Sequence, residues 1–194
     1  METSEVIQRI RISLNDVSQN PKFSDTELLE YLNAAQNEIL FIFNLNIRTL
    51  EFDAVQTFSL KDPLLAVIGI QLNEQNIPLK PPTHITKQAA DIFVFQKNPT
   101  TYSFSKKVQG IVRFTGNFAK HSLQMQDEML LNILFLDALT YGVMIRALQV
   151  SSNEANLQRI ALYQKMYEDE IKSLKQKITA QTQTKNAITP YIKV

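Results

Sequence analysis

The sequence contains no cysteine, no tryptophan, only two histidines and only four glycines in 194 residues. Without cysteine, the chain has no disulfide, no thiolate metal ligand and no thiol nucleophile. His84 and His121 lie far apart and lack the serine and carboxylate pattern of a catalytic triad. Four glycines leave little room for a phosphate-binding loop, and no P-loop, dinucleotide-binding or metalloprotease motif is present. The sequence therefore predicts no enzyme, no cofactor and no metal site.

The chain also lacks an excess of charge of either sign, with 20 Lys+Arg against 19 Asp+Glu and a formal net charge of +1. This balance creates no overall field that would draw the protein to nucleic acid or to a membrane surface. The stretch Met1–Glu5 is acidic and has no apolar core, so we expect no signal peptide.

The longest apolar stretch, from Glu128 to Gln149, predicts a helix that is apolar nearly all round. It is almost long enough to cross a bilayer. However, Asn132, Asp137 and Arg146 interrupt it, and a charge in mid-helix costs about 2.5–3.5 kcal/mol on insertion scales. We therefore favour a buried central helix and no membrane over the alternative of a membrane span.

A second long helix is predicted after the turn Ser151–Glu154, where a serine followed three residues later by a glutamate is typical of a capping box. So short a turn predicts that the two helices form an antiparallel hairpin. Residues at alternating steps of three and four then form a heptad seam. The seam consists of Leu157, Ile160, Gln164, Tyr167, Ile171, Leu174 and Ile178.

Two shorter helices are predicted near the start of the chain. The first covers residues 4–18, where apolar residues recur at helical spacing. The second begins at Ser24, because Ser24 and Glu27 form a capping box and Phe23–Leu28 supplies the flanking hydrophobic staple. It should end near Asn44–Asn46, since asparagine tolerates the left-handed conformation that ends many helices.

Between residues 48 and 120 the apolar pattern changes to that of strands. Leu64–Leu72 is a continuous apolar run rich in β-branched residues, which indicates a buried strand. Ile77, Pro78 and Leu79 begin a proline-rich segment that cannot be a central strand, because proline donates nothing to a ladder. We expect this segment to be an extended arm or a loop.

The predicted fold is therefore mainly α with a β insertion. We expect a helical bundle of about four helices that ends in a long antiparallel helical hairpin, plus a small antiparallel β layer. The predicted regions are 1–47 for the N-terminal helices, 48–120 for the β-rich insertion, 121–178 for the hairpin and 179–194 for a C-terminal tail.

The β insertion interleaves basic and aromatic residues, among them Lys106, Lys107, Tyr102 and Phe104. Such a pattern can bind nucleic acid. More often the aromatic residues form the core of the sheet and the lysines protect its edges. The end of the tail, Ile188–Val194, is apolar but too short to fold alone, so it is either disordered or packed on another chain.

Residues 23–39, with the sequence FSDTELLEYLNAAQNEI, resemble the opening of the head-to-tail connector (adaptor) proteins of tailed phages. In those proteins a helix of the type ELLxxLNxAQxxI follows a short first helix. The resemblance continues through two long helices, the second with a tyrosine at Tyr163, and spans Val6 to Lys177. The similar segments between them are Leu65–Ile70, Ile77–Leu79, Pro99–Phe104 and Ile111–Phe114.

The resemblance implies a structural virion protein without catalytic residues or a cofactor. Connectors form a homo-oligomeric ring, usually a 12-mer, under the portal protein, and they dock the next neck or tail protein. Genomic DNA passes through the lumen without being read. The implied location is the neck of the virion, with the host cytoplasm as the place of assembly. We expect contacts with neighbouring subunits or the portal at Ile77, Pro78, Leu79, Lys106, Lys107, Ile188, Tyr191, Ile192 and Val194.

Two other classes of protein are open. One is a non-viral or scaffolding helical interaction protein that dimerises through its heptad helix, and a stable dimer that ignores portal particles would favour it. The other is a nucleic-acid-binding module that uses the basic and aromatic β insertion. Retention on DNA that depends on salt, and is lost on changing Lys106 and Lys107, would favour that class.

Overall fold

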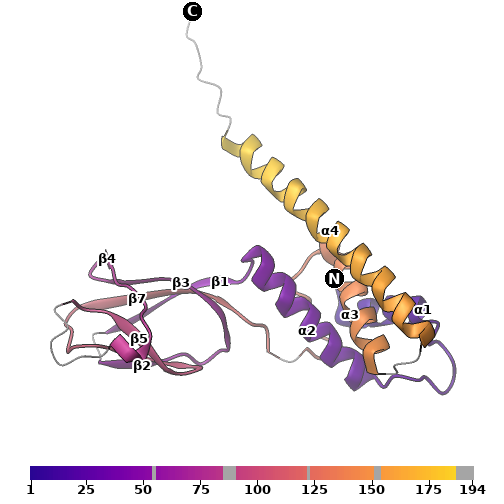
Figure 1. The fold of residues 1–194 in the computed structure, drawn as a ribbon, viewed down its shortest axis with the longest axis horizontal. Coiled ribbons are helices and arrows are strands. Elements are labelled where there is room, and N and C mark those ends of the chain that lie inside the picture. Colours follow the sequence, from indigo (N-terminus) through magenta and orange to yellow (C-terminus); the bar gives the residue numbers. More distant parts are fainter. Residues whose placement is uncertain (54–55, 85–90, 122, 151–153, 187–194) are drawn as a thin grey trace, which may run out of the picture. The chain divides into compact units, whose positions relative to one another are not determined.

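The computed structural model describes residues 1–53, 56–84, 91–121, 123–150 and 154–186. In this part of the chain, helices and strands form two compact units (Figure 1). We call Met1–Gln36 together with Ser122–Val194 the helical unit, and Asn37–His121 the β unit. Helix α2 begins in the helical unit and ends in the β unit.

The helical unit is built on α3, which contacts both α1 and α4. Helix α2 also approaches α3, because a Cβ atom added to Gly142 would lie only 3.1 Å from the Cβ of Ala35. Glycine at this position therefore permits close packing of the two helices. The helices are α1 (Thr3–Leu14), α2 (Asp25–Phe43), α3 (Leu136–Val150) and α4 (Glu154–Asn186), with a 3-10 turn η2 (Ile133–Phe135) before α3.

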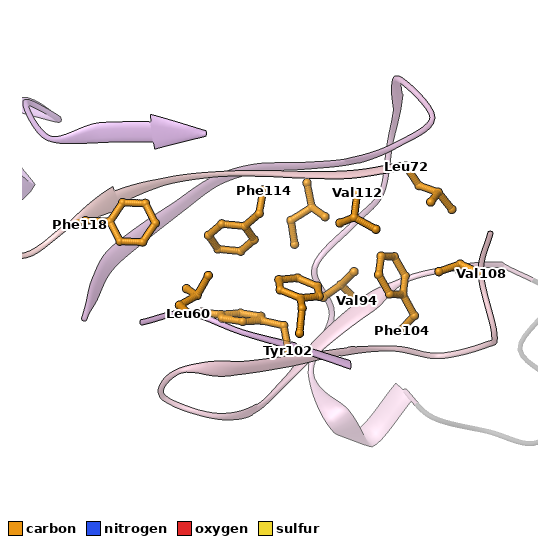
Figure 2. Close-up of a cluster of buried hydrophobic side chains, with 11 residues drawn as sticks. Leu60, Leu72, Val94, Tyr102, Phe104, Val108, Val112, Phe114 and Phe118 are labelled. Atoms are coloured by element: carbon orange, nitrogen blue, oxygen red, sulfur yellow. The ribbon is translucent and has the colours of Figure 1, made fainter. Parts of the chain in front are cut away.

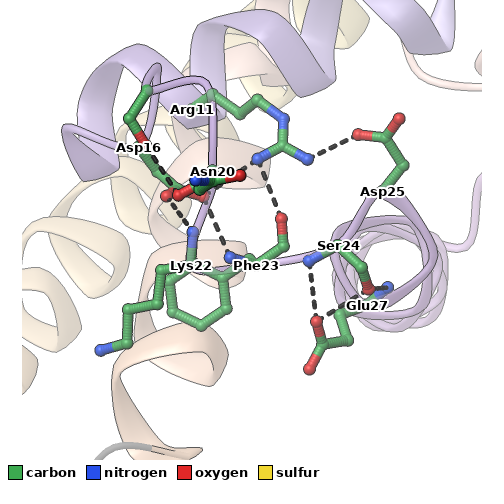
Figure 3. A network of polar contacts seen from close by, with 9 residues as sticks. Arg11, Asp16, Asn20, Lys22, Phe23, Ser24, Asp25 and Glu27 are labelled. Atoms are coloured by element: carbon green, nitrogen blue, oxygen red, sulfur yellow. Dashed lines mark hydrogen bonds and ion pairs between the residues drawn. The ribbon is translucent and has the colours of Figure 1, made fainter.

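A salt-bridged turn joins α1 to α2 (Figure 3). The Arg11 guanidinium donates to the Asp16 carboxylate at 2.9 Å, to the Phe23 carbonyl at 3.0 Å and to the Asp25 carboxylate at 2.5 Å. Asp16 is buried and also accepts from the backbone N–H of Lys22 at 2.6 Å. The network satisfies a buried carboxylate and holds α2 at its first turn.

The predicted capping box at the start of α2 is confirmed (Figure 3). The Ser24 hydroxyl accepts from the Glu27 N–H at 3.2 Å, and the Glu27 carboxylate accepts from the Ser24 N–H at 2.8 Å. These bonds from Ser24 lower the pKa of Glu27. The predicted end of the helix is also confirmed, because Asn44 has a φ of 51° immediately after α2.

The β unit contains two antiparallel sheets. One has the strand order β1-β7-β3-β4 and the other β2-β6-β5. Register places Leu50 of β1 opposite Phe114 of β7 and Phe58 of β2 opposite Tyr102 of β6. The strands are β1 (Ile47–Asp53), β2 (Thr57–Ser59), β3 (Leu64–Leu72), β4 (Gln75–Asn76), β5 (Val94–Asn98), β6 (Thr101–Phe104) and β7 (Ile111–Phe118), and a 3-10 turn η1 (Pro82–His84) precedes β5.

Side chains from both sheets meet in an aromatic core (Figure 2). The rings of Phe58 and Phe114 have centroids 5.7 Å apart, and those of Tyr102 and Phe114 are 5.2 Å apart. Burial raises the pKa of Tyr102. The core cluster consists of Phe58, Leu60, Ile70, Leu72, Val94, Tyr102, Phe104, Val108, Val112, Phe114 and Phe118. Aromatic residues of the β insertion are thus interior side chains, not an exposed stacking surface.

The predicted fold class is wrong, because the protein is mixed α/β. Its two sheets enclose a core of their own instead of forming a small layer on a helical bundle. The described residues also form no long helical hairpin. Helix α3 begins at Leu136 instead of near Glu128 and has 15 residues, against 33 in α4.

Tertiary contacts explain why the apolar residues before Leu136 are not helical. The backbone N–H of Met129 donates to the Met1 carbonyl at 3.0 Å, and that of Leu130 donates to the Gln36 side chain at 3.1 Å. Asn132 then caps the 3-10 turn by accepting from the Leu134 N–H at 3.0 Å. Backbone groups that a helix would have paired internally are satisfied by distant segments, which overrides the helical pattern.

The predicted heptad seam of α4 is wrong at two positions. Leu157 and Gln164 are exposed, whereas Ile160, Ile171 and Leu174 are buried as expected. Tyr163 takes part in the contact instead of Gln164 and stacks on Tyr141 of α3, with ring centroids 6.3 Å apart. The predicted capping box at Ser151 cannot be compared, because residues 151–153 lie outside the described part of the chain.

One described stretch, Ile133–Val150, is long and apolar enough to cross a membrane by length and composition alone. In this structure 56% of that stretch is buried inside the protein. Contacts of α3 with α1 and α4 therefore account for much of its apolar character.

Candidate interaction surfaces

The predicted contact segment Ile77–Leu79 is largely incorporated into the β unit. The backbone N–H of Ile77 donates to the Ile70 carbonyl at 2.8 Å, and the Ile77 side chain lies half-buried against the core. The Pro78 carbonyl accepts from the Val94 N–H at 3.0 Å, so the segment runs beside β5. Leu79 is 44% exposed and presents an apolar side chain to solvent.

The predicted contact residues Lys106 and Lys107 lie in the connection between β6 and β7 and are both exposed. Val108, which follows them, is buried in the aromatic core and anchors the connection. The structure thus places this pair on the surface of the β unit. The remaining predicted contacts, Ile188, Tyr191, Ile192 and Val194, lie outside the described residues.

A groove that the sequence did not predict lies between β1 and β2, and we call it the β1 groove. These strands are the edges of the two sheets, and the rings of Phe52 and Phe58 meet there with centroids 4.8 Å apart. The groove has a volume of about 290 Å³ and is lined by Leu50, Glu51, Phe52, Ser59, Lys61 and Asp62. Alternation in β1 reveals its two faces, but the sequence does not show that β1 is an edge strand.

An ion pair supports one end of the β1 groove. Arg48 donates to the Asp62 carboxylate at 2.7 Å, and its guanidinium lies 4.1 Å from the centroid of the Phe118 ring. His121 approaches the other carboxylate oxygen of Asp62 at 3.3 Å. The hydrogen bond from Arg48 lowers the pKa of Asp62, with a smaller contribution from His121. Asp62 therefore remains ionised near neutral pH and fixes Arg48 across the end of the sheet.

A second cavity, of about 250 Å³, lies at the β3–β4 turn and is lined by Asn73, Glu74, Ile111 and Arg113. The Arg113 guanidinium lies 2.7 Å from Glu51 and 3.6 Å from Glu74, so its charge is already compensated. Asn73 is committed to structure, because its side chain bonds the Gln109 carbonyl and the Ile111 N–H. This cavity therefore offers little to an ionic ligand.

Neither cavity has the composition of a catalytic or metal site. None of the described lining residues is a histidine. Across the described ranges of the chain, no three His, Cys, Asp or Glu side chains are grouped so that they could hold a metal ion.

Apolar side chains are exposed on both units. Those on the helical unit are Ile12, Val17, Leu130, Ile133, Val150, Leu157 and Leu162. Those on the β unit and the end of α2 are Phe41, Leu45, Ile47, Ile68, Leu79 and Ile111. By contrast, much of the seam of α4 that the dimer alternative requires is already buried within the chain, at Ile160, Ile171 and Leu174.

Comparison with known proteins identifies the family. The sequence model of the family described as SU10 adaptor protein matches residues 1–190, which cover the β unit and all but the last four residues of the helical unit. No curated protein matches the chain significantly. Because the family match covers nearly the whole chain, the protein belongs to the SU10 adaptor protein family of tailed-phage head-to-tail connectors, and it is a virion component that interacts with other head or tail proteins.

Proposed function

We propose that this adaptor forms a ring beneath the portal protein, continues the DNA channel into the neck and docks the next neck or tail protein. The observation that carries the proposal is membership of the adaptor family over residues 1–190. By analogy with connectors, the ring contains twelve copies. It assembles in the host cytoplasm, and genomic DNA passes through it without sequence reading.

The exposed apolar side chains support assembly with other chains. Ile12 and Ile133 of the helical unit are each 70% exposed, and Phe41 at the end of α2 is 51% exposed. Leaving apolar area in water costs about 25 cal/mol per Å², so covering such residues with a neighbour would stabilise an assembly. Such residues occur on both units, so each unit offers apolar area to a neighbouring chain.

The charge balance is compatible with DNA passage. A net charge of +1 gives no strong general attraction to DNA. Tight binding through many phosphate contacts would slow movement through the channel. A lumen that contacts the backbone weakly therefore suits a conduit better than a basic binding surface does.

The predicted contact residues remain our assignment for the interfaces. Leu79 is exposed beside β5, and the bonds of Ile77 and Pro78 hold the segment in place. We assign Leu79 and the exposed pair Lys106 and Lys107 to contacts with a neighbouring subunit or the portal. We assign the tail from Ile188 to Val194 to the same role.

The mass in solution, measured by light scattering, tests the proposal for the protein alone and for the protein mixed with its portal. A monomer or a ring-sized particle that joins the portal as a multi-copy ring is the expected result. A fixed dimer without affinity for the portal would overturn the proposal and favour the heptad-dimer class.

Substitutions then separate the proposed contacts. Leu79→Asp should weaken ring or portal assembly, whereas Lys97→Asp, at an exposed position in neighbouring β5, serves as the matched control. Deleting Ala187–Val194 should leave the circular dichroism spectrum unchanged and weaken assembly. Unchanged assembly would remove the tail from the interface.

A further inference from the structure

The first strand of the four-stranded sheet has one free edge. Strand β1 pairs with β7 over all seven residues from Ile47 to Asp53. It is the first strand in the sheet order, and the described residues supply no second ladder to it. A strand edge of this length presents unpaired N–H and C=O groups that can accept another strand.

The two faces of β1 differ beside this edge. Leu50 and Phe52 point toward the core and line the β1 groove. Glu51 and Asp53 alternate with them and are exposed on the opposite face. A strand added to this edge would therefore have one row of side chains beside Leu50 and Phe52 in the groove. The other row would lie beside Asp53 and beside Glu51, whose carboxylate also pairs with Arg113.

The C-terminal segment Ile188–Val194 has the matching pattern. Ile188, Pro190, Ile192 and Val194 alternate with Thr189, Tyr191 and Lys193, so an extended conformation separates an apolar row from a polar row with a cation. Proline is tolerated in an edge strand, where its missing N–H can face away from the ladder.

The length of the segment also fits. Eight residues follow Asn186, the last described residue, and at about 3.3 Å per residue they reach roughly 26 Å. The seven residues of β1 extend about 23 Å by the same measure. The segment can therefore cover most of the strand.

We propose that the segment Ile188–Val194 of a neighbouring copy adds to the free edge of β1. Ile192 and Val194 then lie over the β1 groove beside Leu50 and Phe52, and Lys193 lies beside Glu51 and Asp53. Ordering the segment on binding costs conformational entropy. Because the same contact would be repeated between every pair of neighbouring subunits in a closed assembly, the repeated contacts offset this cost. This inference rests on the proposed function insofar as it requires several copies in one assembly.

The natural absence of cysteine makes disulfide cross-linking a clean test. One preparation carries Asp53→Cys. A second preparation carries Lys193→Cys and a terminal tag, so that the two chains differ in length and a mixed dimer can be recognised by its size. Assembled together and oxidised, they should form a mixed disulfide dimer, because cross-strand neighbours lie within the Cα separation that a disulfide spans. Glu51→Cys paired with Lys193→Cys covers the alternative register.

The matched control pairs Lys97→Cys, exposed on β5 of the other sheet, with Lys193→Cys. We expect the β1 pairs to yield at least tenfold more mixed dimer than this control. Equal yields would overturn the proposal. So would a disulfide that forms only within one chain when both cysteines are placed on it.

A charge exchange provides a second readout without a new covalent bond. Lys193→Glu should lower the fraction of assembled protein several-fold at low salt, and adding Asp53→Lys should restore it. Light scattering on the same samples distinguishes failure of this β1 contact from failure of the proposed ring. An assembled ring without β1 cross-links would remove only this contact, whereas no multi-copy particle, alone or with the portal, would remove the proposed function.

Discussion

The β unit and the helical unit are built from the chain in different ways. Residues 37–121 form the β unit as one continuous stretch, whereas the helical unit combines Met1–Gln36 with the segment after Ser122. The helical unit therefore forms only when these two segments, which are distant in the sequence, pack together. The backbone bonds from Thr3 to Asp127 and from Met129 to Met1, each 3.0 Å long, make part of that closure.

The two units also differ in what fills their interiors. The centre of the β unit is a cluster of aromatic and aliphatic side chains. The joint between α1 and α2 in the helical unit depends instead on a buried carboxylate with an arginine partner. An aromatic core loses stability mainly through cavities, and a buried ion pair loses it when one partner is removed. A substitution of the same size should therefore destabilise the β unit by leaving a cavity and the helical unit by leaving a buried charge without its partner.

The largest effect is expected for Phe114→Ala in the β unit. Phe114 is fully buried and contacts the rings of Phe58 and Tyr102, so its removal leaves a cavity that costs about 3–5 kcal/mol. Hydrogen exchange of the β-strand amides as a function of denaturant should show the loss, while far-UV ellipticity of the helices changes at higher denaturant. Phe41→Ala, at an exposed position on α2, is the control and should change little. A single transition shifted equally for both signals would show that the units do not unfold separately.

A smaller effect is expected for Asp16→Asn in the helical unit. The amide cannot replace the carboxylate toward Arg11 and two backbone N–H groups, so the free energy of unfolding should fall by about 1–3 kcal/mol. Asp25→Asn changes the exposed partner of the same arginine and should cost under about 1 kcal/mol. Thermal unfolding at constant pH measures both. Equal losses would show that burial of Asp16 is not what distinguishes this joint.

A still smaller effect is expected for Ser24→Ala, which removes the N-cap of α2. The lost bond to the Glu27 N–H should cost about 1 kcal/mol. Ser13→Ala removes only an exposed hydroxyl bond to the carbonyl one turn earlier in α1, so it should be within about 0.5 kcal/mol of the parent. Urea midpoints for the two variants measure the difference. If Ser13→Ala matches Ser24→Ala, the cap contributes nothing specific.

The smallest effect concerns acid stability of the β unit. The bond from Arg48 lowers the pKa of Asp62 in the folded state, so the carboxylate stabilises the fold when ionised. That contribution is fully present above the unfolded pKa of about 3.9 and is lost as the pH falls through the lower folded value. Arg48→Met should therefore flatten the dependence of the β-unit melting temperature on pH below about 4. An unchanged slope would assign the acid sensitivity to other carboxylates.

Local signals in the sequence were the most reliable. The bounds of β3 match the predicted strand Leu64–Leu72, because flanking turn residues limit this run. The cap at Ser24 depends on residues only three apart and was confirmed. The error over Glu128–Phe135 arose because Met1 and Gln36, distant in sequence, pair with that backbone.

The candidate surfaces depended even more on context. Leu79 and the pair Lys106 and Lys107 could be named from composition and resemblance, and their exposure followed from the fold. The β1 groove could not be named, because its lining comes from two strands of different sheets. Periodicity shows which side chains share a face, but strand order decides which edges remain free.

The sequence by itself determined the cap at Ser24, the strand Leu64–Leu72, the absence of thiol chemistry and the likeness to connector proteins, since each depends on residue identity or short spacing. Only the tertiary structure decided that the chain is mixed α/β with two sheets around their own core. It also decided that Leu157 faces solvent and that β1 ends its sheet. The physical reason is that burial and edge position arise from contacts between distant segments, which local periodicity does not encode.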